Sequence, residues 1–299
     1  GLDDGFDSCD YKSNEVVYTR PPAREKPLML QSVDSVTLHY LGNNEAMESH
    51  QETLYDGRQA LAQLDFSEVG FTLQRHRSNI TNWLDEEAIN RDHKREIMQL
   101  ALQFSHCDAV VGYPAIIRGP AEAVRHEDHL PIQIAHSDFT DDYRPMILNP
   151  SRPYSAFLAP HLRDAGINYK DLNAAKRLLM LQFWRNTGPV NPDFPLAIAD
   201  ARSVPHHALQ RRTVTDYAGE TLAFETFFLK PPDRKRPYQW YTFPNMTHEE
   251  VLIFRTYDSR QEEAGLPYWT PHSAYSNPDK SSATQFRNSV EMRVLCIFY

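Results

Sequence analysis

Three side chains that suit a metal ion are spread over half of this chain: His136, Asp138 and His272. In an extended strand, alternate side chains point to the same face, so His136 and Asp138 can both turn inward while Ser137 turns away. With the distant histidine they would form a site of two histidines and one carboxylate, which leaves positions open on iron(II) for O2 and a chelating substrate. The plainer alternatives are a packed, hydrogen-bonded His272 and a simple polar pair at 136 and 138.

Arg287 and Ser289 follow the distal histidine and have the chemistry to hold an anion. Positions 287, 289, 291 and 293 alternate along an expected closing strand, so the arginine and the serine can point together into the interior. A guanidinium gives a carboxylate a two-pronged partner, and a hydroxyl adds a further donor. Arg293 is an alternative anchor, and an ordinary ion pair is the alternative role for Arg287.

The elements that must position these residues are mostly strands. In the second half of the chain, β-rich runs separated by turn residues indicate a barrel or sandwich, at residues 196–200, 222–228, 239–243, 251–257 and 290–299. In the first half, shorter apolar or alternating runs predict strands at residues 33–41, 69–74, 109–113 and 132–136. We therefore expect a mainly β core.

Helices are expected to flank this core. Apolar stripes or helix-forming composition favour them at residues 45–64, 85–105, 156–162 and 172–184. The clearest is the second, which Asp85 can cap. Residues 1–30 are polar and interrupted by prolines, which is typical of an arm on the surface. Because no linker is evident, we expect one domain over residues 1–299.

The composition excludes several classes of protein. A net charge of -9 and the absence of a basic stripe argue against a nucleic-acid partner. No apolar run approaches the roughly 18 residues that a membrane span needs, and no secretory signal is present, so a cytoplasmic protein without a membrane partner is expected. Three widely spaced cysteines give neither a disulfide framework nor a thiolate zinc site. A homodimer is compatible with the sequence.

Several segments resemble the signature blocks of the CmcJ/AsaB-like hydroxylase/desaturase family. The blocks lie at residues 183–190, 195–203, 240–254, 257–259, 271–275 and 287–293. The order H-x-D, distal histidine and R-x-S also resembles the plan of iron(II)/2-oxoglutarate oxygenases. The resemblance runs from about Tyr113 to the C-terminus. It departs from the family pattern at Asn186, where proline is common, and at Tyr275, where phenylalanine is common.

The resemblance implies a double-stranded β-helix core, of the jelly-roll or cupin-like kind, that binds Fe(II) through His136, Asp138 and His272. It implies 2-oxoglutarate and O2 as cosubstrates, with Arg287 and Ser289 holding the oxoacid. Members of this fungal and bacterial family are tailoring oxygenases of secondary metabolism. An iron(IV)-oxo species would then hydroxylate, desaturate or otherwise oxidise a small metabolite.

Two other functions stay open for such a chain. One is a cupin-like metalloenzyme, either an isomerase or a dioxygenase that uses no oxoacid. The other is a jelly-roll binding protein without chemistry.

Five further residues are candidates for the substrate pocket: Tyr113, Thr140, Trp184, Arg185 and Tyr241. Arg185 has two interpretations of equal weight. It can bind a carboxylate of the substrate or cosubstrate, or it can be a core strut stacked on a neighbouring aromatic ring.

Overall fold

Two β-sheets form the centre of the computed structural model, which describes residues 30–120 and 126–299. The larger sheet of the described chain has eight strands, in the spatial order β1 (Ser32–Leu41), β2 (Met47–Asp56), β11 (Trp240–Thr242), β8 (Leu196–Ala199), β13 (His272–Ala274), β6 (His136–Ser137), β10 (Glu220–Leu229) and β9 (Leu209–Tyr217). The expected surface arm falls outside the described residues, except for its last position.

The smaller sheet contains the longest buried strands of the fold. Its order is β3 (Phe71–Arg75), β12 (Glu250–Asp258), β7 (Arg177–Asn186), β14 (Ser289–Phe298) and β4 (Ala109–Gly112), and β5 (Ile116–Arg118) also pairs with β14. Neighbouring strands in both sheets run antiparallel, apart from β11, which pairs with β2 in parallel. The prediction of a mainly β core is confirmed.

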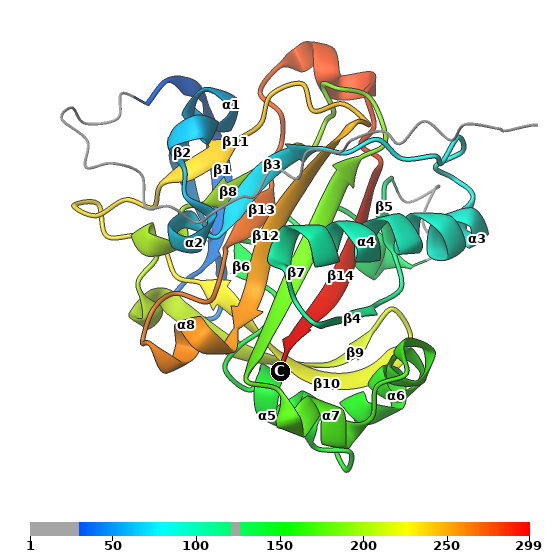
Figure 1. The fold of residues 1–299 in the computed structure, drawn as a ribbon. Coiled ribbons are helices and arrows are strands. Elements are labelled where there is room, and N and C mark those ends of the chain that lie inside the picture. The colour runs from blue at the N-terminus through cyan, green and yellow to red at the C-terminus, as the bar shows by residue number, and fades with distance from the viewer. Residues whose placement is uncertain (1–29, 121–125) are drawn as a thin grey trace, which may run out of the picture.

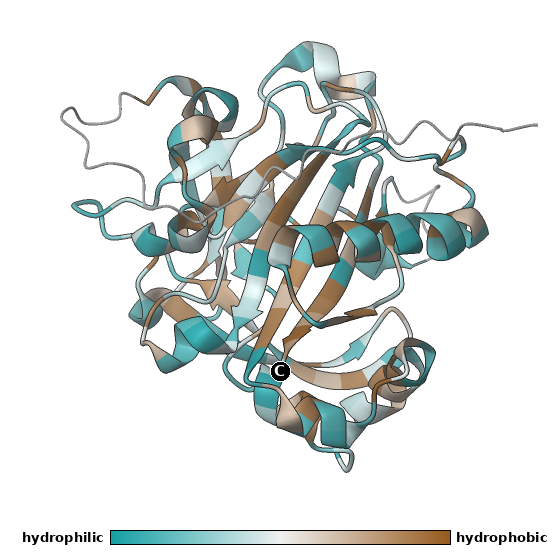
Figure 2. Cartoon of the chain, in the orientation of Figure 1, coloured by the Kyte–Doolittle hydropathy of each residue, from teal (hydrophilic) through white to brown (hydrophobic). Residues whose placement is uncertain are grey.

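Helix α4 (Lys94–Ser105) crosses the outer face of the smaller sheet (Figure 1). It continues α3 (Glu86–Ala88) through a π-helical turn, η2 (Ile89–His93). The side chain of Asp85 accepts a hydrogen bond from the Ala88 backbone N–H at 3.1 Å, which satisfies one of the unpaired donors at a helix start. The predicted helix at 85–105 is confirmed, and Figure 2 shows its polar patches in front of the apolar strands.

One of the remaining helices, α6 (Tyr154–Ala165), is as long as α4 at 12 residues, and the others are short. The short ones are α1 (Gly57–Ala60), η1 (Leu61–Gln63), α2 (Phe66–Val69), η3 (Glu127–His129), α5 (Tyr143–Leu148), α7 (Tyr169–Ala174), η4 (Ala201–Ser203), η5 (His206–Ala208), α8 (Ser259–Glu263) and η6 (Lys280–Thr284). Helix α6 confirms the helix expected at 156–162. In the described part of the chain, no helix has the length and apolar character that crossing a membrane would require.

The helix expected at 172–184 is wrong over most of its length, because residues 177–186 form strand β7. Both faces of β7 are buried: Leu178 and Met180 belong to the cluster between the sheets, and Leu179 and Leu181 to the cluster beneath α4. A strand that is buried on both faces has a continuous apolar run, which cannot be told from a buried helix by periodicity. Only α7 at its start is helical.

The helix expected at 45–64 is also wrong over its first half. Residues 47–56 form β2, which pairs with β1 on one side and with β11 on the other. Its polar composition suits a strand with one wet face, since Glu52 and Leu54 are buried while the intervening Thr53 is exposed. Pairing with neighbouring strands therefore overrides local propensity here.

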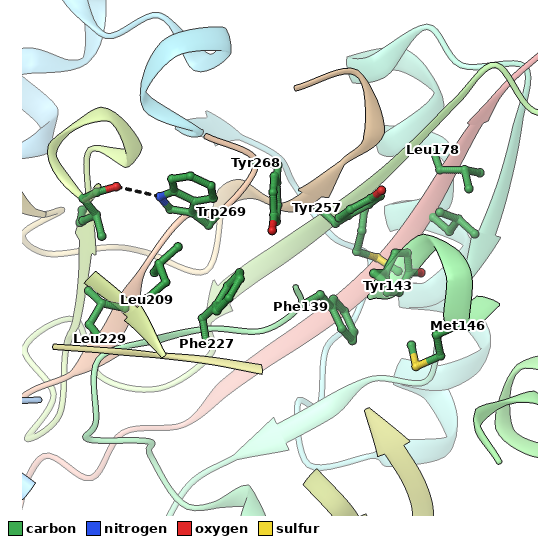
Figure 3. Packing of buried hydrophobic residues seen from close by; sticks show 14 of the residues in the cluster. Phe139, Tyr143, Met146, Leu178, Leu209, Phe227, Leu229, Tyr257, Tyr268 and Trp269 are labelled. Atoms are coloured by element: carbon green, nitrogen blue, oxygen red, sulfur yellow. Dashed lines mark hydrogen bonds between the residues drawn. The ribbon is translucent and has the colours of Figure 1, made fainter. Parts of the chain in front are cut away.

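The space between the sheets is filled at one end by aromatic rings. Figure 3 shows Phe139, Tyr143, Tyr257 and Tyr268 in this cluster, with Trp269 donating a hydrogen bond from Nε1 to a backbone carbonyl at 3.1 Å. Leu295 and Ile297, on the inward face of β14, belong to the same cluster. The other end of that face carries Arg287, Ser289 and the residues of the candidate site.

Candidate active site

Two short strands bring the predicted metal ligands together. Strands β6 and β13 are antiparallel, and His136 lies directly opposite His272. Opposite residues in an antiparallel pair point to the same face, and the two imidazole centroids are 4.4 Å apart. Asp138 follows β6 two residues after His136, so its carboxylate reaches the same face. One ligand atom from each of the three residues lies within 4.8 Å of the other two. In residues 30–120 and 126–299 this is the one group of three such side chains placed to hold a metal ion.

Backbone carbonyls fix the orientation of both histidines. Nδ1 of His136 is 2.7 Å from the Ile134 carbonyl oxygen, and Nδ1 of His272 is 3.0 Å from that of Thr270. Because a carbonyl only accepts, each Nδ1 carries the proton, and the lone pair is on Nε2. The two Nε2 atoms lie 3.4 Å and 3.9 Å from Oδ1 of Asp138. All three lone pairs therefore converge, held by the partners that usually orient metal-binding histidines.

The ionisation of these side chains suits a divalent cation. Burial, with a smaller contribution from His136, lowers the pKa of His272 to about 4, so its imidazole is neutral near pH 7. Burial opposes ionisation of Asp138, but Arg293 and the two histidines outweigh it and hold the pKa of that carboxyl well below its usual range. Two imidazoles and one carboxylate form the donor set of iron(II) oxygenases. The residues present therefore fit such an ion.

A pocket opens directly at these three side chains. It is lined by His136, Asp138, His272, Arg118, Arg287, Arg293, Glu291, Trp184, Ile132, Leu196 and Ala274. The empty space among these side chains, open solvent included, is about 320 Å³. The lining combines three arginines with two carboxylates and a few apolar walls.

Two of the three arginines are paired with the carboxylates. Arg118 donates from Nε to Oε1 of Glu291 at 2.6 Å, and the side-chain amide of Gln182 donates to the other oxygen of Glu291. Arg293 donates from Nη2 to Oδ2 of Asp138 at 2.9 Å. The negative charge of both pocket carboxylates is thus compensated within the protein.

Arg287 is the pocket arginine that forms no ion pair with a carboxylate in the described part of the chain. Its Nη1 donates to the Phe194 carbonyl at 3.1 Å, its guanidinium lies over the Trp184 ring at 5.6 Å, and its Nε has no partner. Burial, and then the charge of Arg118, lower its pKa to about 9, so it is still a cation at neutral pH. Ser289, two residues along, is buried with its hydroxyl unpaired.

Of the five pocket candidates, Trp184 lines the pocket and the other four lie outside its lining. Tyr113 is in the apolar core, with its hydroxyl 3.0 Å from that of Tyr143. Thr140 donates to Glu225 at 2.7 Å. Tyr241 is buried in a cluster with residues of the smaller sheet, where its ring packs on Phe71.

Arg185 has the surroundings of a core strut. It is 1% exposed, and its guanidinium lies over Trp83 at 5.4 Å. It donates to the carbonyls of His76 and His248 at 2.7 Å and 2.6 Å. These contacts are on the outer side of the smaller sheet, whereas the pocket opens on the inner side. Of its two interpretations, the structure favours the packing role.

Sequence reasoning missed Arg118 and the pairing of Glu291. Arg118 ends the short strand β5 and pairs in register with Ser289 of β14. A single arginine closing the apolar run 115–117 was a usable signal, because an isolated charge after a buried strand needs a partner. Ile132, Leu196 and Ala274 gave no such signal, since apolar side chains are equally expected in a core.

Comparison with known proteins agrees with this site. A family model described as "YDMC: Oxidoreductase/YMDC permease-like domain" matches residues 16–297. The hydroxylase/desaturase AsaB of Aspergillus flavus is 29% identical over 130 residues, which are 41% of this chain and 56% of AsaB. The alpha-ketoglutarate-dependent dioxygenase PhiK of a fungal species is 25% identical over 240 residues, 77% of this chain and 78% of PhiK. The matched part thus spans little more than half of AsaB.

A further relative and a solved structure extend this picture. The hydroxylase/desaturase CTB9 of Cercospora beticola is 27% identical over 110 residues, 34% of this chain and 32% of CTB9. The iron and alpha-ketoglutarate-dependent endoperoxidase NvfI superimposes with a TM-score of 0.68 at 19% identity, covering 88% of this chain and 96% of NvfI. This likeness confirms the predicted jelly-roll core. The match over residues 16–297, with these relatives, places the chain in the AsaB-like hydroxylase/desaturase family that its sequence blocks predicted.

Proposed function

We propose that this protein is an iron(II)/2-oxoglutarate-dependent oxygenase that oxidises a small metabolite. The observation that carries the proposal is the convergence of His136, Asp138 and His272 in a pocket that also contains a buried arginine without a carboxylate partner. A binding protein has no need of this donor set, and an enzyme that uses no oxoacid has no need of the spare cation. Two separate features therefore support one function.

An iron(II) ion held by these three residues would keep coordination positions free for an oxoacid and O2. Bound iron would supply the activation of O2 and the abstraction of hydrogen from the substrate. The protein contributes position and a desolvated site, since the three side chains are 5–9% exposed. Both imidazoles are oriented through Nδ1, so their Nε2 atoms face the metal position.

Arg287, with Ser289, is the anchor that we propose for the far carboxylate of 2-oxoglutarate. The alternative anchor, Arg293, already donates to Asp138 at 2.9 Å, and Arg118 already donates to Glu291 at 2.6 Å. Arg287 retains unpaired donors, and a buried cation gains most from an incoming carboxylate. Ser289 presents a buried, unpaired hydroxyl on the same strand face.

The lining of the pocket suits a small organic molecule as the substrate and is compatible with more than one kind of product. Trp184, Ile132 and Leu196 give it apolar walls beside the charged floor. The relatives are named for hydroxylation or desaturation and, in the case of NvfI, for endoperoxide formation. We infer a small secondary metabolite as the substrate. The homodimer, the cytoplasmic location and the single-domain organisation expected from the sequence remain predictions.

Anaerobic titration with Fe(II) and 2-oxoglutarate tests the proposal. We expect the wild-type protein to bind one Fe(II) and to develop a visible charge-transfer band when the oxoacid is added, because both must meet at one metal. His272→Ala should lose the band, and admission of O2 to the wild type should release succinate and CO2. Metal binding without any effect of the oxoacid would instead support the cupin-like enzyme. No metal binding would support the binding protein.

A further inference from the structure

The two oxygens of the Asp138 carboxylate have different surroundings. Oδ1 faces the histidines, 3.4 Å from Nε2 of His136 and 3.9 Å from Nε2 of His272. Oδ2 accepts a hydrogen bond from Nη2 of Arg293 at 2.9 Å. One oxygen is therefore turned toward the metal position, and the other is held by a cation of the opposite sheet.

Arg293 is suited to hold that oxygen in place. It lies on β14, directly opposite Gln182 of β7 in the strand register, and both strands are buried in the smaller sheet. Its side chain is 15% exposed and its Nε has no partner, because Glu291, the other carboxylate of the pocket, is already taken by Arg118 and Gln182. A charge-assisted hydrogen bond in such a site is strong and directional.

The number of carboxylate oxygens on a metal decides how many positions remain for other ligands. A carboxylate can bind a metal through one oxygen or through both. Three protein ligands that each use one atom leave three positions on an octahedral ion, enough for a chelating oxoacid and O2. A carboxylate that binds through both oxygens takes one of those positions and leaves two.

We propose that Arg293 is a positioning residue that keeps Asp138 a ligand through Oδ1 alone, and so keeps the third position of the metal open. The inference rests on the proposed function, because it concerns the same metal site. The proposal gives different roles to Arg287, which precedes β14, and to Arg293, which lies on β14. Arg287 binds the cosubstrate, and Arg293 acts through Asp138 on the metal.

The number of water molecules on bound Mn(II) tests this directly. Mn(II) can replace Fe(II) without redox chemistry, and broadening of its electron paramagnetic resonance lines in 17O-enriched water counts the waters that it carries. We expect three waters on the wild-type protein and two on Arg293→Met, because the freed Oδ2 can then bind the ion. Mn(II) affinity should change by about 10- to 100-fold, as is typical when an outer partner of a metal ligand is removed.

Matched variants separate positioning from general packing. Arg185→Lys, a change at another buried arginine of the smaller sheet outside the pocket, should keep three waters. Arg293→Lys, which retains a cationic donor, should keep three waters as well. In turnover, Arg293→Met should lower kcat and change the KM for 2-oxoglutarate only a few-fold, since Arg287 is intact. If Arg293→Met does not fold, Arg293→Leu, which also lacks a donor, is measured in its place with the same expectation.

Three waters and unchanged affinity in a folded Arg293→Met or Arg293→Leu protein would overturn the inference while leaving the proposed function standing. A wild-type protein that binds neither Mn(II) nor Fe(II) would overturn the proposed function itself. The two failures are therefore distinguished by the wild-type measurement alone.

Discussion

Two buried arginines on opposite faces of the smaller sheet share almost every local property. Arg185 belongs to β7 and Arg287 immediately precedes β14, and they are 1% and 3% exposed. Each guanidinium lies over an indole ring, that of Trp83 at 5.4 Å and that of Trp184 at 5.6 Å. Burial lowers the pKa of Arg185 to about 10 and that of Arg287 to about 9.

What separates them is the supply of acceptors. Arg185 donates to two carbonyls and to Nδ1 of His76, at 2.6–2.7 Å. Arg287 donates to one carbonyl and otherwise faces the pocket. The acceptors of Arg185 come from loops around positions 76 and 248, far from it in sequence. Arg185 is thus held by acceptors from distant loops, whereas Arg287 keeps donors that face the pocket.

The largest effect should come from replacing Arg185, the arginine that is held by acceptors from distant loops. Arg185→Met leaves two buried carbonyls and one imidazole nitrogen without their charged donor, so we expect the free energy of unfolding to fall by about 3–5 kcal/mol. Chemical denaturation measures this loss. At a low temperature at which Arg185→Met is still folded, its KM for 2-oxoglutarate should equal that of the wild type. A large rise in that KM with unchanged stability would reverse the assignment of the two arginines.

Replacing Arg287 should have the opposite effects on stability and on the KM for 2-oxoglutarate. Arg287→Met deletes a buried cation that has no carboxylate partner in the described structure, so stability should stay equal or rise. The KM for 2-oxoglutarate should increase on the order of a hundredfold, as when one member of a buried charge pair is removed. Arg287→Lys keeps the charge but loses the two-pronged guanidinium, so its KM for 2-oxoglutarate should lie between those of the wild type and Arg287→Met. Steady-state kinetics with varied oxoacid measures both variants, and an unchanged KM would favour an enzyme that needs no oxoacid.

The residues that the structure brings together at the pocket were easier to find in the sequence than the elements around them were to predict. His136, Asp138, His272 and Arg287 are recognisable because their chemistry requires particular residue types in a particular order. The sequence predicts a helix where strand β7 lies, because burial on both faces removes the alternation that identifies a strand. The two roles of Arg185 could not be separated either, since its acceptors depend on the paths of distant loops. Pairing between remote residues, including Arg118 with Glu291, is visible only in three dimensions.

The contact between Arg185 and His76 also predicts that stability depends on pH. Burial, and then the charge of Arg185, lower the pKa of His76 from 6.5 to about 4. Between these values the unfolded chain binds a proton that the folded protein does not, so stability should decrease as the pH falls from 6.5 toward 4. Because the ring is only half-buried, we expect a loss of about 1–2 kcal/mol, less than the full shift would give.

Comparison with His76→Gln isolates this contribution from other groups that titrate over the same range. The amide oxygen of glutamine can still accept from Arg185 but does not titrate. The wild type should lose more stability than His76→Gln when both are denatured at pH 6.5 and at pH 4. Parallel curves would show that His76 is not coupled to folding.

The smallest effect should come from the hydroxyl beside the anchor. Ser289 is buried on the inward face of β14 with its Oγ unpaired, and Arg287 lies two residues before it on the same face. If that hydroxyl donates to the carboxylate that Arg287 binds, Ser289→Ala removes one hydrogen bond of about 0.5–1.5 kcal/mol. The KM for 2-oxoglutarate should then rise about 2- to 10-fold, with little change in stability, because no partner within the protein is lost.

Thr256→Val provides the matched control. Thr256 is buried in β12, its hydroxyl also lacks a partner, and it does not line the pocket. Its replacement should leave the KM unchanged, because an unpaired hydroxyl away from the oxoacid contributes nothing to binding. Equal kinetic effects of the two variants would mean that the hydroxyl of Ser289 does not contact the cosubstrate, and that Arg287 holds the carboxylate without it.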